Sequence, residues 1–271
     1  MNGKTPSWLE RRLDEPRLCG LELGTKEWFA AQREVIRSRP LLRACYDLWY
    51  RRLLEDARSV PASPGALLVE LGSGGSYLKE LAPDVITSDI IPGIAERVVR
   101  AESLPFCDGS VRALFLTHSF HHLPDVEAFL REARRVLVEG GVISMIEVAH
   151  TAFSRFFFDR FHPEPYTPTA PGWSLAQSNA MLDSNQALSW IVLFRDRARF
   201  QARFPTLHLE ACEHLPWLSY LMAGGVTKRS LLPARAAPLV LGLERRLSGL
   251  SPWMALHWHL RIRKVTGPRT G

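Results

Sequence analysis

The chain has 271 residues, of which 46% are hydrophobic and 23% charged, and its formal net charge is +6. This composition is typical of a soluble globular protein and excludes fibrous, collagen-like and disordered chains. No stretch reaches the roughly 18 uninterrupted apolar residues that span a bilayer, and the N-terminus carries charges where a signal peptide needs an apolar run. The four cysteines are widely separated, which favours buried thiols in a reducing, cytoplasmic compartment and predicts no metal site.

The positive charge is concentrated near the C-terminal end. Residues 228–271 contain nine Lys or Arg and one acid, whereas residues 1–227 contain 25 bases and 27 acids. Such a segment can meet an anionic surface or form an ordinary solvated face, and the pattern leaves both readings open.

Three units are predicted along the chain. Residues 1–60 form an N-terminal helical cap, because apolar side chains recur there at three- and four-residue steps. A Pro- and Gly-containing linker then leads into an α/β domain over residues 61–227. Residues 228–271 form a basic, apolar C-terminal extension.

The α/β domain alternates strands and helices. Apolar runs predict strands at residues 66–71, 85–89, 97–100, 111–117 and 142–148. The clearest helix begins at Pro124-Asp125 and is expected to end at Gly140-Gly141. Residues 184–204 are expected to be helical and residues 207–214 extended. This order predicts a doubly wound, mostly parallel sheet.

Residues 151–183 interrupt the alternation and are predicted to form an insertion. Residues 151–173 alone contain seven aromatic side chains and four prolines. The rings can form a lid over a ligand, or they can form the core between the insertion and the N-terminal helices.

The clearest motif begins where the first predicted strand ends. Glu70 is followed by Gly72-Ser73-Gly74-Gly75, which lets the backbone turn sharply and approach a ligand at the N-terminus of the next helix. Tyr77 stands where a dinucleotide-binding fingerprint needs a third glycine. Asp89 ends the second strand 17 residues after Gly72, where an acid can accept both hydroxyls of a ribose.

Four motifs in order resemble those of the small-molecule, class I S-adenosylmethionine-dependent methyltransferases, in the methyltransferase type 11-like group. The motifs are Glu70 to Ser76, Asp89, Ala101 to Phe106 with Asp108-Gly109-Ser110, and His121 to Asp125. The resemblance covers about residues 66–148 and identifies the predicted α/β domain as a methyltransferase domain. It implies a Rossmann-like fold and S-adenosyl-L-methionine as the cofactor.

The resemblance also implies the residues of the cofactor site. Glu70, Gly72, Ser73 and Gly74 would lie by the methionine portion, Asp89 by the ribose, Ala101, Glu102 and Leu104 by the adenine, and Thr117 and His118 beneath the sulfonium. Arg100 departs from the pattern, because similar enzymes often have an acid there for the adenine amino group. A backbone carbonyl, Glu102 or apolar contacts would take over that role.

Four residues near the ends of the fourth and fifth strands are candidate catalytic groups: His118, His121, Glu147 and His150. A general base is needed only if the methyl acceptor must lose a proton. A purely structural role remains open for two pairs of these and neighbouring residues. His121 and His122 can simply shape the entry of the following helix, and Glu147 with His150 can be a hydrogen-bonded structural pair.

The sequence therefore favours a methyltransferase that acts on a small, apolar or lipid-like acceptor by direct displacement. The aromatic insertion and the basic extension predict an acceptor presented at a membrane surface, with peripheral contact through residues 228–271. An RNA or protein methyltransferase is one alternative. Nucleic acid is disfavoured because no Asn-Pro-Pro-Tyr or Asp-Pro-Pro-Tyr follows the fourth strand and no RNA-binding module is evident. A non-catalytic binding subunit with the same fold is the other alternative.

Overall fold

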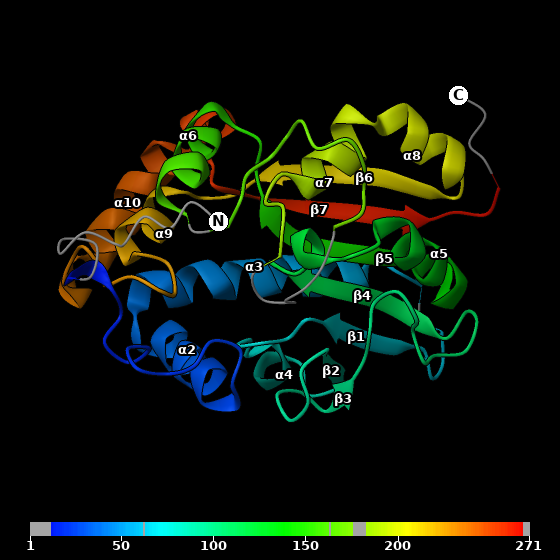
Figure 1. Cartoon of the computed structure of the whole chain (residues 1–271), viewed down its shortest axis with the longest axis horizontal. Coiled ribbons are helices and arrows are strands. Elements are labelled where there is room, and N and C mark those ends of the chain that lie inside the picture. The colour runs from blue at the N-terminus through cyan, green and yellow to red at the C-terminus, as the bar shows by residue number, and fades with distance from the viewer. Residues whose placement is uncertain (1–11, 62, 163, 176–182, 268–271) are drawn as a thin grey trace.

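The computed structural model describes residues 12–61, 63–162, 164–175 and 183–267. Within these residues the chain forms a seven-stranded sheet of order β3-β2-β1-β4-β5-β7-β6 (Figure 1). The strands are β1 (Leu67–Leu71), β2 (Val85–Asp89), β3 (Arg97–Val98), β4 (Val111–Thr117), β5 (Leu137–Val148), β6 (Leu207–His214) and β7 (His257–Lys264). The first five strands are parallel, and β7 is antiparallel to both neighbours. The predicted Rossmann-like, mostly parallel sheet is confirmed.

Helices connect and cover these strands. They are α2 (Lys26–Ser38), α3 (Pro40–Arg58), α4 (Leu78–Leu81), α5 (Val126–Val136), α6 (Ala152–Phe161), α7 (Leu188–Trp190), α8 (Arg197–Arg203), α9 (Leu218–Ala223), α10 (Ala237–Arg246) and α11 (Ser251–Met254). Short 3₁₀ turns are η1 (Phe120–His122), η3 (Ala234–Ala236) and η4 (Ser248–Leu250), and η2 (Ile191–Arg195) is a π-helix. None of the described helices has the length and apolar character needed to cross a bilayer.

Helix α3 covers one face of the sheet. Its side chains Trp49, Tyr50 and Leu53 are fully buried and belong to the same apolar cluster as Phe115 of β4. The burial of such large side chains stabilises the fold by roughly 1.5 to 3 kcal/mol each. The part of the predicted N-terminal helical cap that forms α3 is therefore packed as a layer on the sheet, and residues 1–11 of that prediction lie outside the described residues.

Polar contacts also hold α3 in place against the sheet. The carboxylate of Asp56 accepts hydrogen bonds from the Ser144 hydroxyl at 2.6 Å, from His259 Nε2 at 2.8 Å and from Arg261 at 2.8 Å. Burial opposes the charged carboxylate, but these partners outweigh it and hold the pKa of Asp56 below its usual range. Three elements distant in sequence thus meet at one buried charge.

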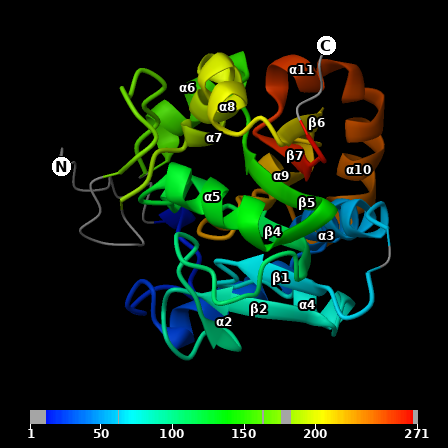
Figure 2. The same ribbon diagram turned by 90° about the vertical axis from the view of Figure 1, so that its right-hand side faces the viewer.

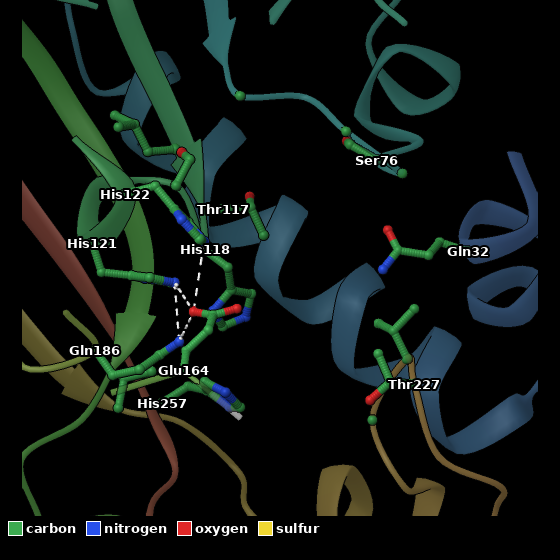
Figure 3. A pocket seen from close by; sticks show the side chains of 18 of the residues that line it. Gln32, Ser76, Thr117, His118, His121, His122, Glu164, Gln186, Thr227 and His257 are labelled. Carbon is green, nitrogen blue, oxygen red and sulfur yellow. Dashed lines mark hydrogen bonds and ion pairs between the residues drawn. The ribbon is translucent and has the colours of Figure 1, made fainter. Parts of the chain in front are cut away.

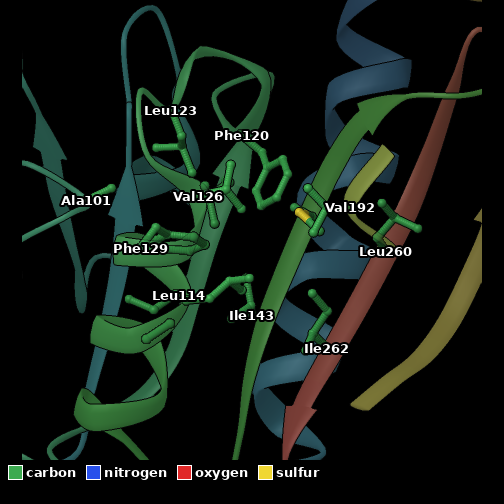
Figure 4. Close-up of a cluster of buried hydrophobic side chains, with 14 of the residues drawn as sticks. Ala101, Leu114, Phe120, Leu123, Val126, Phe129, Ile143, Val192, Leu260 and Ile262 are labelled. Atoms are coloured by element: carbon green, nitrogen blue, oxygen red, sulfur yellow. The ribbon is translucent and has the colours of Figure 1, made fainter. Parts of the chain in front are cut away.

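Helix α5 covers the opposite face, and Figure 2 shows α5 and α3 on either side of β4 and β5. The apolar stripe predicted for this helix is buried, and Val126 and Phe129 pack with Leu114 and Ile143 of the sheet (Figure 4). The side chain of Asp125 caps the helix by accepting from the Ala128 amide at 2.9 Å.

The predicted end of α5 at Gly140-Gly141 is wrong. The helix ends at Val136, and both glycines lie inside β5. The pairing of β4 with β5 shifts register in this region, and a Cβ on Gly141 would lie 2.8 Å from the carbonyl oxygen of Val138. The glycines therefore permit a local irregularity of the strand and do not stop the helix.

Strand β7 comes from the segment that the sequence places in a C-terminal extension. Its residues pair with β5 from Val142↔Arg263 to Val148↔His257 and with β6 on the other side. Trp258, expected at a membrane interface, is only 4% exposed. Strand β7 is thus an inner strand of the central sheet, paired along both of its edges.

The cysteines also differ from expectation. All four thiols are free, but only Cys45 is buried, while Cys19, Cys107 and Cys212 are exposed. Two of the exposed thiols lie in surface turns and Cys212 lies on the edge strand β6, so the prediction of four buried thiols is wrong.

Candidate active site

A cavity of about 770 Å³ lies at the carboxyl ends of β1, β2 and β4. Its size is in the range of sites that hold small molecules, roughly 300 to 1,000 Å³. Figure 3 shows two facing walls. One wall carries histidines and Glu164, and the other carries Gln32, Ser76 and Thr227.

The structure brings most of the predicted site residues to this cavity. Those that line it are Gly72, Ser73, Gly74, Asp89, Ala101, Glu102, Thr117, His118 and His121. Glu70, Leu104, Glu147 and His150 do not line it. Glu147 nevertheless reaches the cavity wall indirectly, because it contacts His121.

The glycine loop after β1 has a backbone that only glycine fits. Gly72 has φ +69° and Gly74 has φ +44°, both in the left-handed region. A Cβ on Gly74 would lie 2.9 Å from Cε1 of Phe29 on α2. The N-terminal helix therefore closes directly over the loop, a contact that sequence reasoning did not anticipate.

Asp89 lies at the end of β2 and is 6% exposed. Its two carboxylate oxygens accept the backbone amides of Gly74 at 2.9 Å and Ile91 at 3.0 Å. Each carboxylate oxygen has a further lone pair, so Asp89 can still accept ribose hydroxyls while it holds the loop. This geometry fits the predicted cofactor role.

The adenine end is formed by Ala101 and Glu102, which line the cavity. Leu104 lies in the core beside them, 3% exposed. Arg100, the departure from the family pattern, places Nε 3.6 Å from Oε2 of Glu102. Glu102 is thus the carboxylate present at this end.

Glu70 lies outside the cavity wall and is 1% exposed. Burial is the largest effect on this carboxyl and raises its pKa to about 7. Neither carboxylate oxygen has a hydrogen-bond partner among the described residues. The structure therefore places the Glu70 side chain in the interior and not at the cavity surface, where the resemblance put it.

His118 follows β4 and has φ 54°, the one positive value of a non-glycine residue in the described chain. Such backbone strain costs on the order of 1 to 3 kcal/mol and is concentrated at functional sites. Burial lowers the pKa of His118 to about 4, so the ring is neutral. Its Nε2 has no partner in the described structure, nor has the buried hydroxyl of Thr117. Two polar atoms at the cavity are thus available to a ligand.

His121 lies between two carboxylates. Its Nδ1 is 2.6 Å from Oε2 of Glu147, and its Nε2 is 3.5 Å from Oε2 of Glu164. Burial disfavours the charged ring, but the two carboxylates outweigh it and raise the pKa of His121 to about 10. Neither His118 nor His121 therefore titrates near neutral pH.

Sequence reasoning missed other residues of this wall. Glu164, Gln186 and His257 all line the cavity, and His122 was assigned only a structural alternative. Glu164 follows α6, Gln186 precedes α7 and His257 begins β7. No local motif marks these residues, because they come from distant segments that meet only in the folded chain.

His150 lies outside the lining of the cavity. Its Nδ1 is 2.6 Å from the Tyr166 hydroxyl, and its ring stacks on Trp190 with centroids 3.9 Å apart. Burial lowers its pKa to about 4. The structure thus does not bring His150 into the cavity or into contact with Glu147.

The aromatic insertion contributes both cavity-lining rings and a buried ring. Phe153, Phe157, Phe158 and Phe161 of α6 line the cavity. Trp173 is 2% exposed in the core next to α5, and its indole donates to Asp196 at 2.8 Å. Four rings of the insertion thus line the cavity, whereas Trp173 packs in a cluster that contains no residue of α2 or α3 and so does not form the predicted core with the N-terminal helices.

Part of the chain matches a known protein family. Residues 69–145 match a family model described as a methyltransferase domain. A search of curated proteins found no match.

Solved structures with similar folds were also found. A complex between the Trm112 methyltransferase activator of Haloferax volcanii and a methyltransferase matches with 13% identity over 88% of this chain and 98% of that chain, at TM-score 0.48. The geranyl diphosphate C-methyltransferase of Streptomyces coelicolor A3(2) matches with 17% identity over 94% and 89%, at TM-score 0.48. The YcgJ protein of Bacillus subtilis matches with 18% identity over 80% and 100%, at TM-score 0.45.

The parallel sheet, the glycine loop and the acid at the end of β2 define a nucleoside-binding α/β enzyme. With the match over residues 69–145, the protein contains a methyltransferase domain and is an S-adenosylmethionine-dependent methyltransferase, with S-adenosyl-L-methionine as its cofactor.

Proposed function

We propose that the protein transfers a methyl group from S-adenosylmethionine to a bulky, apolar small molecule. One observation carries this proposal: a single cavity contains both the glycine loop at Gly72 and the aromatic side chains of α6, including Phe157. Tyr220 and Leu221 add to the apolar wall. Ligand sites lined in this way bind apolar molecules and orient them with a few polar groups.

The cofactor supplies an electrophilic methyl group when it is bound. Displacement at that carbon depends mainly on alignment in a site that excludes water. In this proposal Gly72 and Gly74 hold the methionine portion, Asp89 accepts the ribose hydroxyls, and the phenyl rings of α6 exclude water. The unpartnered Nε2 of the neutral His118 accepts a hydrogen bond from the acceptor. The pKa of His118 is too low for a strong general base, which favours catalysis by positioning.

The proposal extends to where the acceptor is found. Apolar side chains that are more than half exposed follow the rim of the cavity and the neighbouring helices: Phe156, Phe161, Leu231, Leu239 and Trp253. Phe161 and Leu231 also line the cavity, and α11 contacts α6. Arg245 and Arg246 end α10 on the same segment. An amphiphilic acceptor held in an anionic membrane surface suits this combination of apolar and basic side chains.

Transfer of a labelled methyl group tests the proposal. The full chain is incubated with S-adenosylmethionine carrying an isotopically labelled methyl group and, in separate reactions, with a lipid extract, total RNA and a protein extract. We expect label in the lipid-soluble fraction, and none with the Gly72→Ala variant. Label confined to RNA or to protein would overturn the small-molecule acceptor, and no label in any fraction while S-adenosylmethionine binds would favour a non-catalytic role.

A further inference from the structure

We propose that His121, His122 and Glu164 form a binding site for a divalent first-row transition-metal ion in the cavity wall. The residue spacing in the sequence predicts no metal site. The three side chains nevertheless place one ligand atom each within 4.8 Å of the others. Figure 3 shows His121 and His122 directed toward the carboxylate of Glu164.

The distances between the ligand atoms suit a shared ion. Oε2 of Glu164 lies 3.5 Å from Nε2 of His121 and 3.6 Å from Nε2 of His122. These separations exceed an ordinary N–H···O hydrogen bond of about 2.7 to 3.2 Å. Two ligands bound to one tetrahedral ion at about 2.0 to 2.2 Å are roughly 3.4 Å apart. The carboxylate therefore already has the spacing to each imidazole that an ion requires.

The surroundings of His121 resemble the support of a metal ligand. Its Nδ1 faces Glu147 at 2.6 Å, and Glu147 also accepts the Phe120 amide at 2.9 Å. A carboxylate on one imidazole nitrogen fixes the ring and directs the other nitrogen to a metal. Here the other nitrogen faces Glu164.

Gln186 supplies a fourth polar group. It is 2% exposed, and its amide nitrogen lies 3.3 Å from Nε2 of His121. The same nitrogen donates to Oε2 of Glu164, and the Ser184 hydroxyl donates to that oxygen at 2.9 Å. Gln186 and Ser184 thus orient the carboxylate that faces both histidines.

The charges around the cluster also favour a bound cation. Glu147 is fully buried and Glu164 is 21% exposed, and the ion pairs of both in the described chain are with histidine. Two carboxylates thus meet the same pair of imidazoles. A divalent cation compensates two carboxylate charges, which favours its binding in a low-dielectric site.

Two imidazoles and one carboxylate suit Zn²⁺ and Fe²⁺, and three protein ligands leave coordination positions open. These positions would face the cavity. If the proposed function holds, the ion would bind an oxygen atom of the acceptor, so the acceptor class is a hydroxylated or enolic molecule. Metal binding itself does not depend on that function.

Calorimetry on the chelator-treated full chain, with Zn²⁺ and Mn²⁺ as separate probes and metal analysis by mass spectrometry, tests the site. We expect one ion per chain, and at least a 100-fold loss of affinity in Glu164→Gln and in His122→Ala. Glu147→Gln should weaken binding by roughly 10- to 100-fold through His121. His208→Ala, on the distant strand β6, should bind as the wild type does.

A thermal shift of the unaltered chain on addition of Zn²⁺ provides a readout that requires no variant to fold. No heat of binding and no thermal shift with either ion, in a chain that still binds S-adenosylmethionine, would overturn the site. Binding that survives in both ligand variants would overturn it as well. If the chain binds one metal ion but methylates no small molecule, the proposed function would be overturned. The metal site would still be supported.

Discussion

A Cβ atom added to Gly72 would lie 2.6 Å from the Cβ of Ser119. The two residues follow the neighbouring strands β1 and β4, which pair through Leu71↔Leu116. The Ser119 hydroxyl also donates to the Leu71 carbonyl at 2.9 Å. The glycine loop after β1 and the loop that carries the histidines are thus packed directly on each other.

We predict that Gly72→Ala abolishes cofactor binding. The left-handed backbone costs about 1 to 2 kcal/mol for an L-residue, and the contact with Ser119 requires the loop to move. Calorimetry should show at least a 100-fold loss of S-adenosylmethionine affinity. Gly249→Ala is a matched control, because nothing lies within 4 Å of its Cβ and it should bind normally. Unchanged affinity in Gly72→Ala would contradict the loop's assigned role.

Asp89→Asn tests the ribose contact. The substitution keeps the shape but removes the charge that strengthens hydrogen bonds to the loop amide of Gly74 and to the ligand. Each weakened charge-assisted bond contributes about 1.5 to 3 kcal/mol, so affinity for S-adenosylmethionine should fall by roughly 10- to 150-fold. Asp84→Asn, exposed just before β2, should have no effect. If the wild type bound NADH tightly and did not bind S-adenosylmethionine, the assignment of Asp89 to the ribose of S-adenosylmethionine would be contradicted.

We predict that the buried carboxyl of Glu70 makes the free energy of unfolding depend on pH. Burial raises the pKa of its carboxyl from 4.5 to about 7, so the folded state holds the proton more tightly than the unfolded state. This stabilisation is fully present below pH 4.5 and is lost as the pH rises through 7. Glu70→Gln, which stays neutral, should therefore gain in unfolding free energy over the wild type between pH 5 and pH 8.

The gain should be on the order of 3 kcal/mol, since one pKa unit corresponds to about 1.4 kcal/mol. Urea unfolding of the cofactor-free protein at several pH values measures it. Glu139→Gln, whose side chain is 56% exposed, is the control and should show no such trend. A difference between Glu70→Gln and the wild type that does not change with pH would mean that Glu70 is charged in the folded protein.

Neighbouring phenylalanines of α6 distinguish an acceptor site from structural packing. Phe157 lines the cavity, whereas Phe156 is 54% exposed and does not line it. Phe157→Ala should raise KM for the acceptor about tenfold or more while cofactor affinity stays within a few-fold. Phe156→Ala should leave KM for a dissolved acceptor unchanged. An equal loss of acceptor and cofactor affinity in Phe157→Ala, with a lower Tm, would assign this ring to the core.

Vesicle co-sedimentation tests the membrane contact. Anionic vesicles should bind the protein at low salt, and neutral vesicles should not. Each base near an anionic leaflet contributes about 1 kcal/mol, so Arg245→Glu with Arg246→Glu should weaken binding at least tenfold. The matched control is Arg51→Glu with Arg58→Glu, two exposed positions on α3. Absence of binding to anionic vesicles at low salt would remove the membrane surface from the proposal.

The sequence by itself determined the segments whose signals are local. The glycine loop, the acid at Asp89 and the apolar stripe of α5 depend on backbone requirements and side-chain periods within about 20 residues. Their order was sufficient to predict the parallel sheet over residues 66–148, which the structure confirms.

Tertiary structure alone decided where distant segments meet. Strand β7 lies between β5 and β6, and the apolar residues expected to face a membrane include Trp258, which this pairing buries. Likewise, His121 approaches Glu164 and Gln186 because η1, the segment after α6 and the segment before α7 converge on one wall. Strand pairing and side-chain clusters of this kind depend on contacts across long loops, which leave no periodic or local pattern in the sequence.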